Sequence, residues 1–297
     1  MNTTFAPGLG VRLEKIVDVD AHEGPVYATD EHALYFTSLP RDLRVDVKRL
    51  DLVTRTVSTL RSDANMANGM TLAPDGRLLV CEQGSQTRRA RISALDRETG
   101  RAETVVDEWR GLPLNSPNDV VVADDGAIWF TDPSYGFLQG FRPASRSGDY
   151  VYRHDPASGR TDVVADAFDK PNGLAFSPDG TILYVGDSGA NHEPGSYDPA
   201  RPHHTIAFDV VGGRLGNERL FSVTTPGFPD GLKVDSAGRV YSSAASGVQV
   251  FAPESGELLG EIPLRGAVNF CFGSTEDVLY VTADSAVWAV HFDSKGL

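Results

Sequence analysis

LNSPNDVVVADDGAIWFTDPSYG, residues 114–136, contains a pattern from which the architecture of the whole chain can be worked out. Two apolar runs, at 120–122 and 128–130, consist of β-branched and aromatic residues and flank the pair Asp125-Gly126. Glycine in such a pair supplies the positive φ that a tight hairpin turn requires. The stretch therefore predicts a β-hairpin, with the polar residue Asn118 in front of its first strand. Because a lone hairpin cannot bury its apolar face, copies of it are expected elsewhere.

The same pattern, a polar residue followed by an apolar run, a turn and a second apolar run, occurs six times along the chain. The spacing from the leading polar residue to the turn is 9 in the first copy and 8 in the other five. The leading residues are Glu23, Asn68, Asn118, Asn172, Asp230 and Asn269, and the turns are marked by His32, Gly76, Gly126, Gly180, Gly238 and Asp277. Six matched spacings indicate a structural repeat.

A second turn, rich in Asp, Ser, Thr and Gly, follows each of the first five hairpins, as in Asp96-Arg-Glu-Thr-Gly100. Alternating segments such as 47–50, 150–153 and 248–251 precede these turns and read as third strands. Each repeat then carries four antiparallel strands, which is typical of a propeller blade.

The sixth copy has no fourth strand after 286–292, since the chain reaches a turn-like segment at 293–296. The segment 11–19, VRLEKIVDV, has strand composition and belongs to no hairpin. We expect it to complete the last blade, because a closed ring leaves no long exposed sheet edge. The predicted fold is all-β, a six-bladed β-propeller in a single domain over residues 1–297.

Composition limits the classes of partner. The chain has 27 basic and 41 acidic residues, a formal charge of −14 and no basic block, so a nucleic-acid partner is not expected. No signal peptide and no apolar run of about 18 residues occurs, so we expect a cytoplasmic protein without a membrane partner. Cys81 and Cys271 lie in apolar runs and are predicted to be buried free thiols.

The six leading residues are the first candidates for chemistry, because the first strand of each blade lines the central channel of a propeller. One interpretation is that a polar residue opens each inner strand simply because the channel is wet. The set favours another: all six are oxygen donors, two are carboxylates, and none is Cys or His, which describes a site for a hard divalent cation. His22, next to Glu23, is expected to point away from the channel, as neighbours on a strand do.

A second set of acids occurs 14 or 15 residues after the leading residues of four repeats, at Glu82, Asp132, Asp187 and Asp284. We expect them one strand further from the axis; Asp187 could also cap its own loop. Two long loops, at 133–148 and 188–204, leave the second strand at the same end. Long loops in a compact domain are often functional, so these are expected to cover the pocket. The residues expected to roof the pocket and select the substrate are Tyr135, Phe137 and Arg142 in the first loop, and His203 and His204 in the second.

The opening stretch, taken with EGPVY from Glu23, NGMTLAPDGRLLVCEQG from Asn68, KPNGLAFSPDGTILYVGDSG around Asn172 and FPDGLKVDSAGRVY around Asp230, resembles the gluconolactonase and regucalcin-like (senescence marker protein) family of six-bladed propellers. The SPNDV…IWFTDPSYG portion resembles its bacterial gluconolactonase-like branch. One departure is Gln83, where related lactonases often have a histidine.

The resemblance implies a lactonase that opens a sugar lactone of the gluconolactone type, with one divalent metal ion polarising the ester carbonyl for attack by water. Calcium is the first expectation for the ion, with Mg²⁺, Mn²⁺ or Zn²⁺ as alternatives. Two other functions stay open: an organophosphate hydrolase of the phosphofluoridate type on the same metal site, and a non-catalytic ligand-binding propeller.

The residues expected at this site follow from the resemblance and from the two sets above. The metal ligands are expected to be Glu23, Asn118, Asn172 and Asp230, with Asp230 also the candidate catalytic base. The candidate substrate contacts are Asn68, Asn118, Glu82, Tyr135 and His204, and the candidate supporting residues are Asp187, Asp132 and Asn269.

Overall fold

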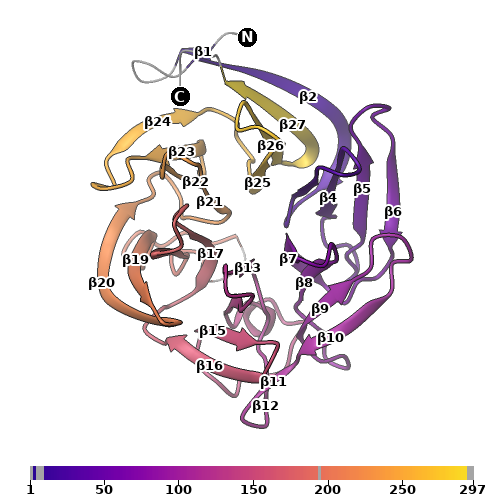
Figure 1. The fold of residues 1–297 in the computed structure, drawn as a ribbon, viewed down its shortest axis with the longest axis vertical. Helices are drawn as coiled ribbons and strands as arrows, with labels where there is room; N and C mark the ends of the chain where they lie inside the picture. The colour runs from indigo at the N-terminus through magenta and orange to yellow at the C-terminus, as the bar shows by residue number, and fades with distance from the viewer. Residues whose placement is uncertain (1–2, 5–9, 193–194, 293–297) are drawn as a thin grey trace.

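The computed structural model describes residues 3–4, 10–192 and 195–292, and its strands form six antiparallel sheets arranged in a ring (Figure 1). The first two blades comprise β3 (Val26–Ala28), β4 (Ala33–Thr37), β5 (Val47–Asp51) and β6 (Val57–Arg61), then β7 (Ala67–Leu72), β8 (Leu78–Glu82), β9 (Arg91–Leu95) and β10 (Ala102–Val106). The third comprises β13 (Val120–Val122), β14 (Ile128–Asp132), β15 (Tyr150–Asp155) and β16 (Arg160–Ala165). The fourth and fifth comprise β17 (Pro171–Phe176), β18 (Ile182–Asp187), β19 (His204–Val211) and β20 (Arg214–Val223), then β21 (Leu232–Val234), β22 (Val240–Ala244), β23 (Gly247–Phe251) and β24 (Leu258–Ile262). The predicted six-bladed β-propeller is confirmed.

The hairpin predicted from residues 114–136 forms as expected. Strand β13 pairs antiparallel with β14, with Val120 opposite Phe130 and Val122 opposite Ile128. Gly126 in the connecting turn has a φ of 80°, a value that L side chains rarely adopt. Four of the other marked turn positions also have positive φ: His32, Gly76, Gly180 and Gly238.

The ring closes between the two ends of the chain. Strand β2 (Gly10–Ala21) pairs antiparallel with β27 (Asp284–Phe292), which continues the sheet of β25 (Asn269–Phe272) and β26 (Val278–Thr282), and β1 (Thr3–Thr4) adds to the outer edge. Figure 1 shows β2 alongside β27. The predicted closing strand is therefore confirmed, whereas the turn-like segment 293–296 lies outside the described residues.

The hydrophobic core lies between the blades. Six clusters of buried side chains occur, one between each pair of neighbouring blades. Within β14, Trp129 packs in the cluster shared with blade four and Phe130 in the cluster shared with blade two. Middle strands such as β4 and β14 are buried on both faces for this reason. Packing between blades, with about 1.5 to 3 kcal/mol from each large apolar side chain, holds the inner strands around the axis.

Two small elements were not anticipated from the sequence. A one-turn helix, α1 (Tyr135–Leu138), lies in the first long loop, and β11 (Glu108–Trp109) pairs with β12 (Leu112–Pro113) in a short hairpin. Both cysteines are buried and free, as predicted. Among the described residues, no helix has the length and apolar composition needed to cross a membrane.

Candidate active site

Five of the six leading residues of the repeats converge on one cavity of about 320 Å³. They are Glu23, Asn68, Asn118, Asn172 and Asp230. The convergence follows from the fold, because equivalent positions of successive blades surround the axis (Figure 1). The sixth, Asn269, is buried but is not among the residues that line the cavity.

The two carboxyl groups of this ring, Glu23 and Asp230, lie close enough to interact with each other. Burial raises the pKa of Glu23 to about 7. Burial and the charge of Glu23 raise the pKa of Asp230 well above the ordinary carboxyl range. Within the described part of the chain, neither forms an ion pair with Lys or Arg. Two neighbouring acids that are shielded from solvent and have no Lys or Arg partner are costly when both are ionised, which is a local imbalance that a bound cation would correct.

Asn269 holds Glu23 from behind the cavity. Its side-chain NH₂ donates to Glu23 Oε2 at 2.7 Å, and its side-chain oxygen Oδ1 accepts from the backbone N–H of Phe270 at 2.8 Å. The backbone of Glu23 is also held, because its N–H donates to Thr37 Oγ1 at 3.1 Å and its carbonyl accepts from the same hydroxyl at 3.0 Å. The Glu23 carboxylate is therefore oriented before any ligand binds.

A glycine follows the leading residue in four of the six repeats, which is a signal in the sequence for close approach of the inner strands. Gly173 N–H donates to the carbonyl of Asp230 at 3.0 Å, and Gly69 N–H donates to that of Asn118 at 2.8 Å. A Cβ on Gly173 would lie 2.2 Å from the Asp230 carbonyl oxygen. Only glycine permits this approach, so these positions set how closely the inner strands, and the ring residues on them, can meet.

The ring fits a hard divalent cation. Glu23, Asn118, Asn172 and Asp230 present carboxylate and carboxamide oxygens to the same cavity, which are ligands that calcium and magnesium prefer. The charge of two carboxylates balances a dication. Among the described residues, no three or more His, Cys, Asp and Glu side chains form a cluster that could hold a metal ion. A zinc-type site built on imidazole and thiolate therefore has no counterpart in this part of the chain.

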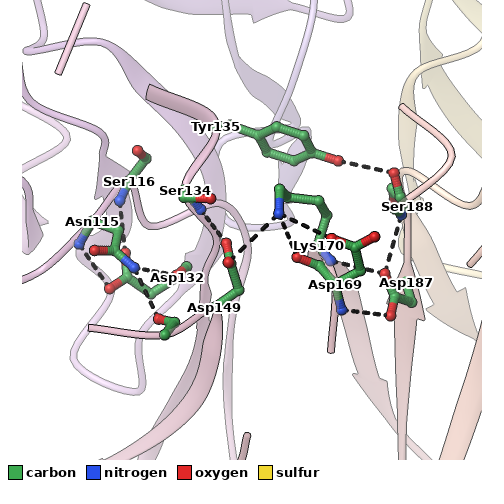
Figure 2. Close-up of polar contacts among 12 residues, drawn as sticks. Asn115, Ser116, Asp132, Ser134, Tyr135, Asp149, Asp169, Lys170, Asp187 and Ser188 are labelled. Carbon is green, nitrogen blue, oxygen red and sulfur yellow. Dashed lines mark hydrogen bonds and ion pairs between the residues drawn. The ribbon is translucent and has the colours of Figure 1, made fainter. Parts of the chain in front are cut away.

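The loop after β14 covers one side of the cavity through α1. Tyr135, Leu138 and Gln139 line the cavity, and the Tyr135 hydroxyl donates to the carbonyl of Ser188 at 3.4 Å (Figure 2). Burial and the charge of Asp230 raise the pKa of Tyr135 well above its ordinary value, so the phenol stays protonated and can donate a hydrogen bond. Phe137, in the same helix, is instead exposed.

Asp132 and Asp187, at the ends of their second strands, bind backbone rather than the cavity (Figure 2). Asp132 accepts from the N–H groups of Asn115 and Ser116 at 2.8 and 2.7 Å. Asp187 accepts from those of Lys170 and Gly189 at 2.8 and 3.1 Å, the second being a cap of its own loop. Each thus holds the segment that leads to a ring residue, Asn118 or Asn172.

Two predicted substrate contacts, Glu82 and His204, do not lie at the cavity. Glu82 is buried and accepts from the Arg91 guanidinium and from Ser93, since the alternation of β8 turns it toward β9. His204 lines a separate cavity of about 280 Å³ between blades three and four. The structure gives no support for a substrate contact at either residue.

His22 corrects one expectation, because it lines the cavity instead of pointing away from it. It lies between β2 and β3, where the alternation of a strand does not apply, and it precedes Gly24, whose φ is 59°. Arg142, expected to face the substrate, is buried and donates to four backbone carbonyls, those of Ser85, Arg88, Leu114 and Asn115. Lining residues that the sequence did not single out are Ser38, Asn191 and His192.

Comparison with known proteins agrees with this geometry. Residues 21–285 match the family model described as SMP-30/Gluconolactonase/LRE-like region. The gluconolactonase of Zymomonas mobilis is 30% identical over 99% of this chain and 86% of its own length. A gluconolactonase structure from Xanthomonas campestris superposes with a TM-score of 0.83 at 34% identity, covering 95% of this chain and 90% of the other.

The calcium-binding protein regucalcin from Agrobacterium tumefaciens superposes with a TM-score of 0.71 over 98% of this chain and 95% of its own. Its identity is 18%, so this likeness shows the fold alone. The family model and the Zymomonas relative both span most of the chain. The chain therefore belongs to the SMP-30/gluconolactonase/LRE-like family.

Proposed function

We propose that this protein is a lactonase that hydrolyses a sugar lactone of the gluconolactone type, with one divalent metal ion bound in the central cavity. The observation that carries the proposal is the pair of carboxylates, Glu23 and Asp230, which interact with each other in the cavity beside the carboxamides of Asn118 and Asn172. Membership of the family and the lactonase names of the relatives at 30% and 34% identity support it.

Glu23, Asn118, Asn172 and Asp230 would hold the ion, with Asn118 free to contact the substrate instead. Because the donors are all oxygen atoms, calcium is the ion we propose first, ahead of Mg²⁺, Mn²⁺ or Zn²⁺. Asn269 would hold the Glu23 carboxylate in place for the ion.

A dication held by these four residues would supply a Lewis acid for the lactone carbonyl. Asp230 would accept a proton from the water that attacks the carbonyl carbon. A dication bound beside this carboxylate would weaken it as a base, so polarisation of the carbonyl would contribute more than proton transfer. The same proton then goes to the ring oxygen as the carbon–oxygen bond of the lactone breaks. The products are balanced: one lactone and one water give one aldonic acid.

Other residues of the cavity would hold the sugar. Asn68 and Tyr135 line it and can bond hydroxyl groups of the lactone, the first as donor and acceptor and the second as acceptor, since its O–H donates to Ser188. The cavity of about 320 Å³ is at the small end of ligand sites, which suits a single sugar ring.

The test is hydrolysis of D-glucono-1,5-lactone by the purified protein, followed with a pH indicator. Activity should disappear after chelation and dialysis and return on addition of calcium. Asp230→Asn should lower turnover about 10²- to 10⁴-fold, whereas Glu257→Gln, at an exposed turn before β24, serves as the matched control. Full turnover after complete metal removal would contradict the proposal, and faster hydrolysis of a phosphofluoridate would favour the organophosphate alternative.

A further inference from the structure

His22 and Asp284 form a hydrogen-bonded pair beside the cavity, although they are 262 residues apart in the sequence. The distance from His22 Nδ1 to the nearer Asp284 carboxylate oxygen is 2.8 Å. An ionised carboxylate can only accept, so His22 donates through Nδ1–H. In the neutral ring the other nitrogen, Nε2, is then left as a hydrogen-bond acceptor.

The structure corrects the expected place of Asp284, which begins the third strand of its blade, β27, whereas Glu82, Asp132 and Asp187 end second strands. Glu82, Asp132 and Asp187 are buried and bonded to their own or adjacent loops and strands. Asp284 is about half-exposed at its side chain, and the only hydrogen bond of that side chain to another described residue is with His22. Asp284 therefore binds a side chain at the cavity, His22, instead of holding a loop of its own blade as the other three acids do.

The backbone of Asp284 is strained for this task. Its φ is 53°, in the left-handed region that non-glycine residues enter at a cost of the order of 1 kcal/mol. Asp284 lies opposite Ala21 in the pairing of β2 with β27, and an irregularity of register precedes Ala21. His22 leaves the sheet directly after Ala21, so the irregular end of the closing strand brings the imidazole next to the carboxylate.

The surroundings of His22 match a polyhydroxylated ligand. His22 lines the cavity together with Asn68 and Gln83. The proposed metal ligands and the proposed base, Asp230, serve the ester carbonyl of the substrate. A sugar lactone also carries several hydroxyl groups, which need partners in the rest of the cavity.

We propose that Nε2 of His22 accepts a hydrogen bond from a hydroxyl group of the bound sugar lactone, and that Asp284 is a positioning residue that holds the imidazole for this contact. The inference rests on the proposed function and deepens it, since it assigns a residue that selects hydroxylated lactones over plain ones.

Two substitutions of His22 test the roles of its two ring nitrogens one at a time. His22→Asn keeps an amide where Nδ1 lies, within reach of Asp284, and places nothing at Nε2. His22→Gln reaches the position of Nε2 without the bond to Asp284. Asp284→Gly removes the acceptor while fitting the positive φ of that position.

The matched control is a second pair of a histidine and a carboxylate, in which the histidine lies on β27, the strand of Asp284. His291 Nε2 lies 3.1 Å from Glu14 Oε2, with side chains that are 31% and 27% exposed, and neither residue lines the cavity. His291→Asn should therefore keep the kinetic constants of the wild type.

The kinetic test compares D-glucono-1,5-lactone with δ-valerolactone, which has no hydroxyl groups, in the presence of calcium. His22→Asn should lower kcat/KM for the sugar lactone about 3- to 10-fold more than for δ-valerolactone, through KM, as expected for one neutral hydrogen bond. His22→Gln should restore part of the difference, and Asp284→Gly should show a smaller loss of the same selectivity. Equal losses on both lactones, or no loss on either, would overturn the proposal.

A second readout does not need turnover. In protein labelled with ¹⁵N-histidine, the wild type should show His22 protonated at Nδ1, and D-gluconate should shift the Nε2 resonance of His22 but not that of His291. If the wild type hydrolyses neither lactone, the proposed function fails, and this spectrum alone decides the inference. A His22 resonance that does not move at saturating gluconate would then refute it.

Discussion

Glu23→Gln should stabilise the metal-free protein at alkaline pH and at the same time abolish its stabilisation by calcium. Glutamine keeps the size of the side chain and an oxygen that can accept from the Asn269 amide. It removes one of the two carboxylate charges of the ring. The substitution therefore separates the structural cost of this carboxylate from its proposed use in binding a cation.

The magnitude follows from the pKa of Glu23, which burial raises from 4.5 to about 7 in the folded protein. A raised pKa means that the folded state holds the proton more tightly than the unfolded state. Stability is then greatest below about pH 4.5 and is lost as the pH rises through about 7. At about 1.4 kcal/mol for each pH unit, the ionised carboxylate costs the metal-free protein on the order of 3 kcal/mol at pH 8.

The assay is urea unfolding at pH 5 and pH 8, with chelator and with calcium. At pH 8 with chelator the variant should exceed the wild type by about 2 to 3 kcal/mol, and the gain should shrink greatly at pH 5. Calcium should raise the stability of the wild type and leave that of the variant nearly unchanged.

The control is Glu14→Gln, which should have the opposite sign. Hydrogen bonds from Arg55 and Arg12 lower the pKa of Glu14 to about 2, so its charge stabilises the folded protein above about pH 4.5. Its loss should destabilise the protein at both pH values and leave the response to calcium intact. The reasoning about Glu23 would be refuted if Glu23→Gln were less stable than the wild type at pH 8 without metal, or if the variant kept the full response to calcium.

Three further substitutions test the surroundings of the ring. Asn269→Leu should weaken calcium binding about 10-fold or more, measured by titration calorimetry, because Glu23 loses the amide that orients it; unchanged affinity would remove Asn269 from the site. Arg142→Met should lower the free energy of unfolding by about 2 to 4 kcal/mol in urea, since four backbone carbonyls lose a donor; a loss below about 0.5 kcal/mol would show that water replaces it. Gly173→Ala should cost about 1 to 3 kcal/mol and weaken calcium binding, because its Cβ would collide with the carbonyl of Asp230; a variant as stable as the wild type would show that the inner strands can move apart.

The architecture could be predicted from local patterns. The period of two in each strand and the glycine at turns such as Gly126 are properties of a few neighbouring residues. Six copies with matched spacing then require six similar sheets, and an unpaired strand at 11–19 has one place left in the ring. The shared cavity of Glu23 and Asp230 follows as well, because equivalent positions in a ring of repeats face the same axis.

The loops could not be predicted in the same way. Arg142 has a charged side chain of the kind that often binds substrate, but its loop follows a path that buries this side chain among backbone carbonyls of two blades. The sequence pattern puts His204 at the end of a long loop, but His204 is the first residue of β19. In the pairing of β19 with β18 its side chain lines the cleft between blades three and four. The direction in which such side chains point depends on the path of the loop and cannot be predicted from the residue types alone.

Repeated spacing along the chain sets the number of blades, the strand that closes the ring and the oxygen donors at its axis. What surrounds those donors depends on contacts between distant blades. The tertiary structure brings His22 beside Asp284 across 262 residues, places Asn269 behind Glu23 and keeps Glu82 away from the cavity. These contacts depend on where one strand ends and the next begins, and that is set by packing between blades that are distant in the chain.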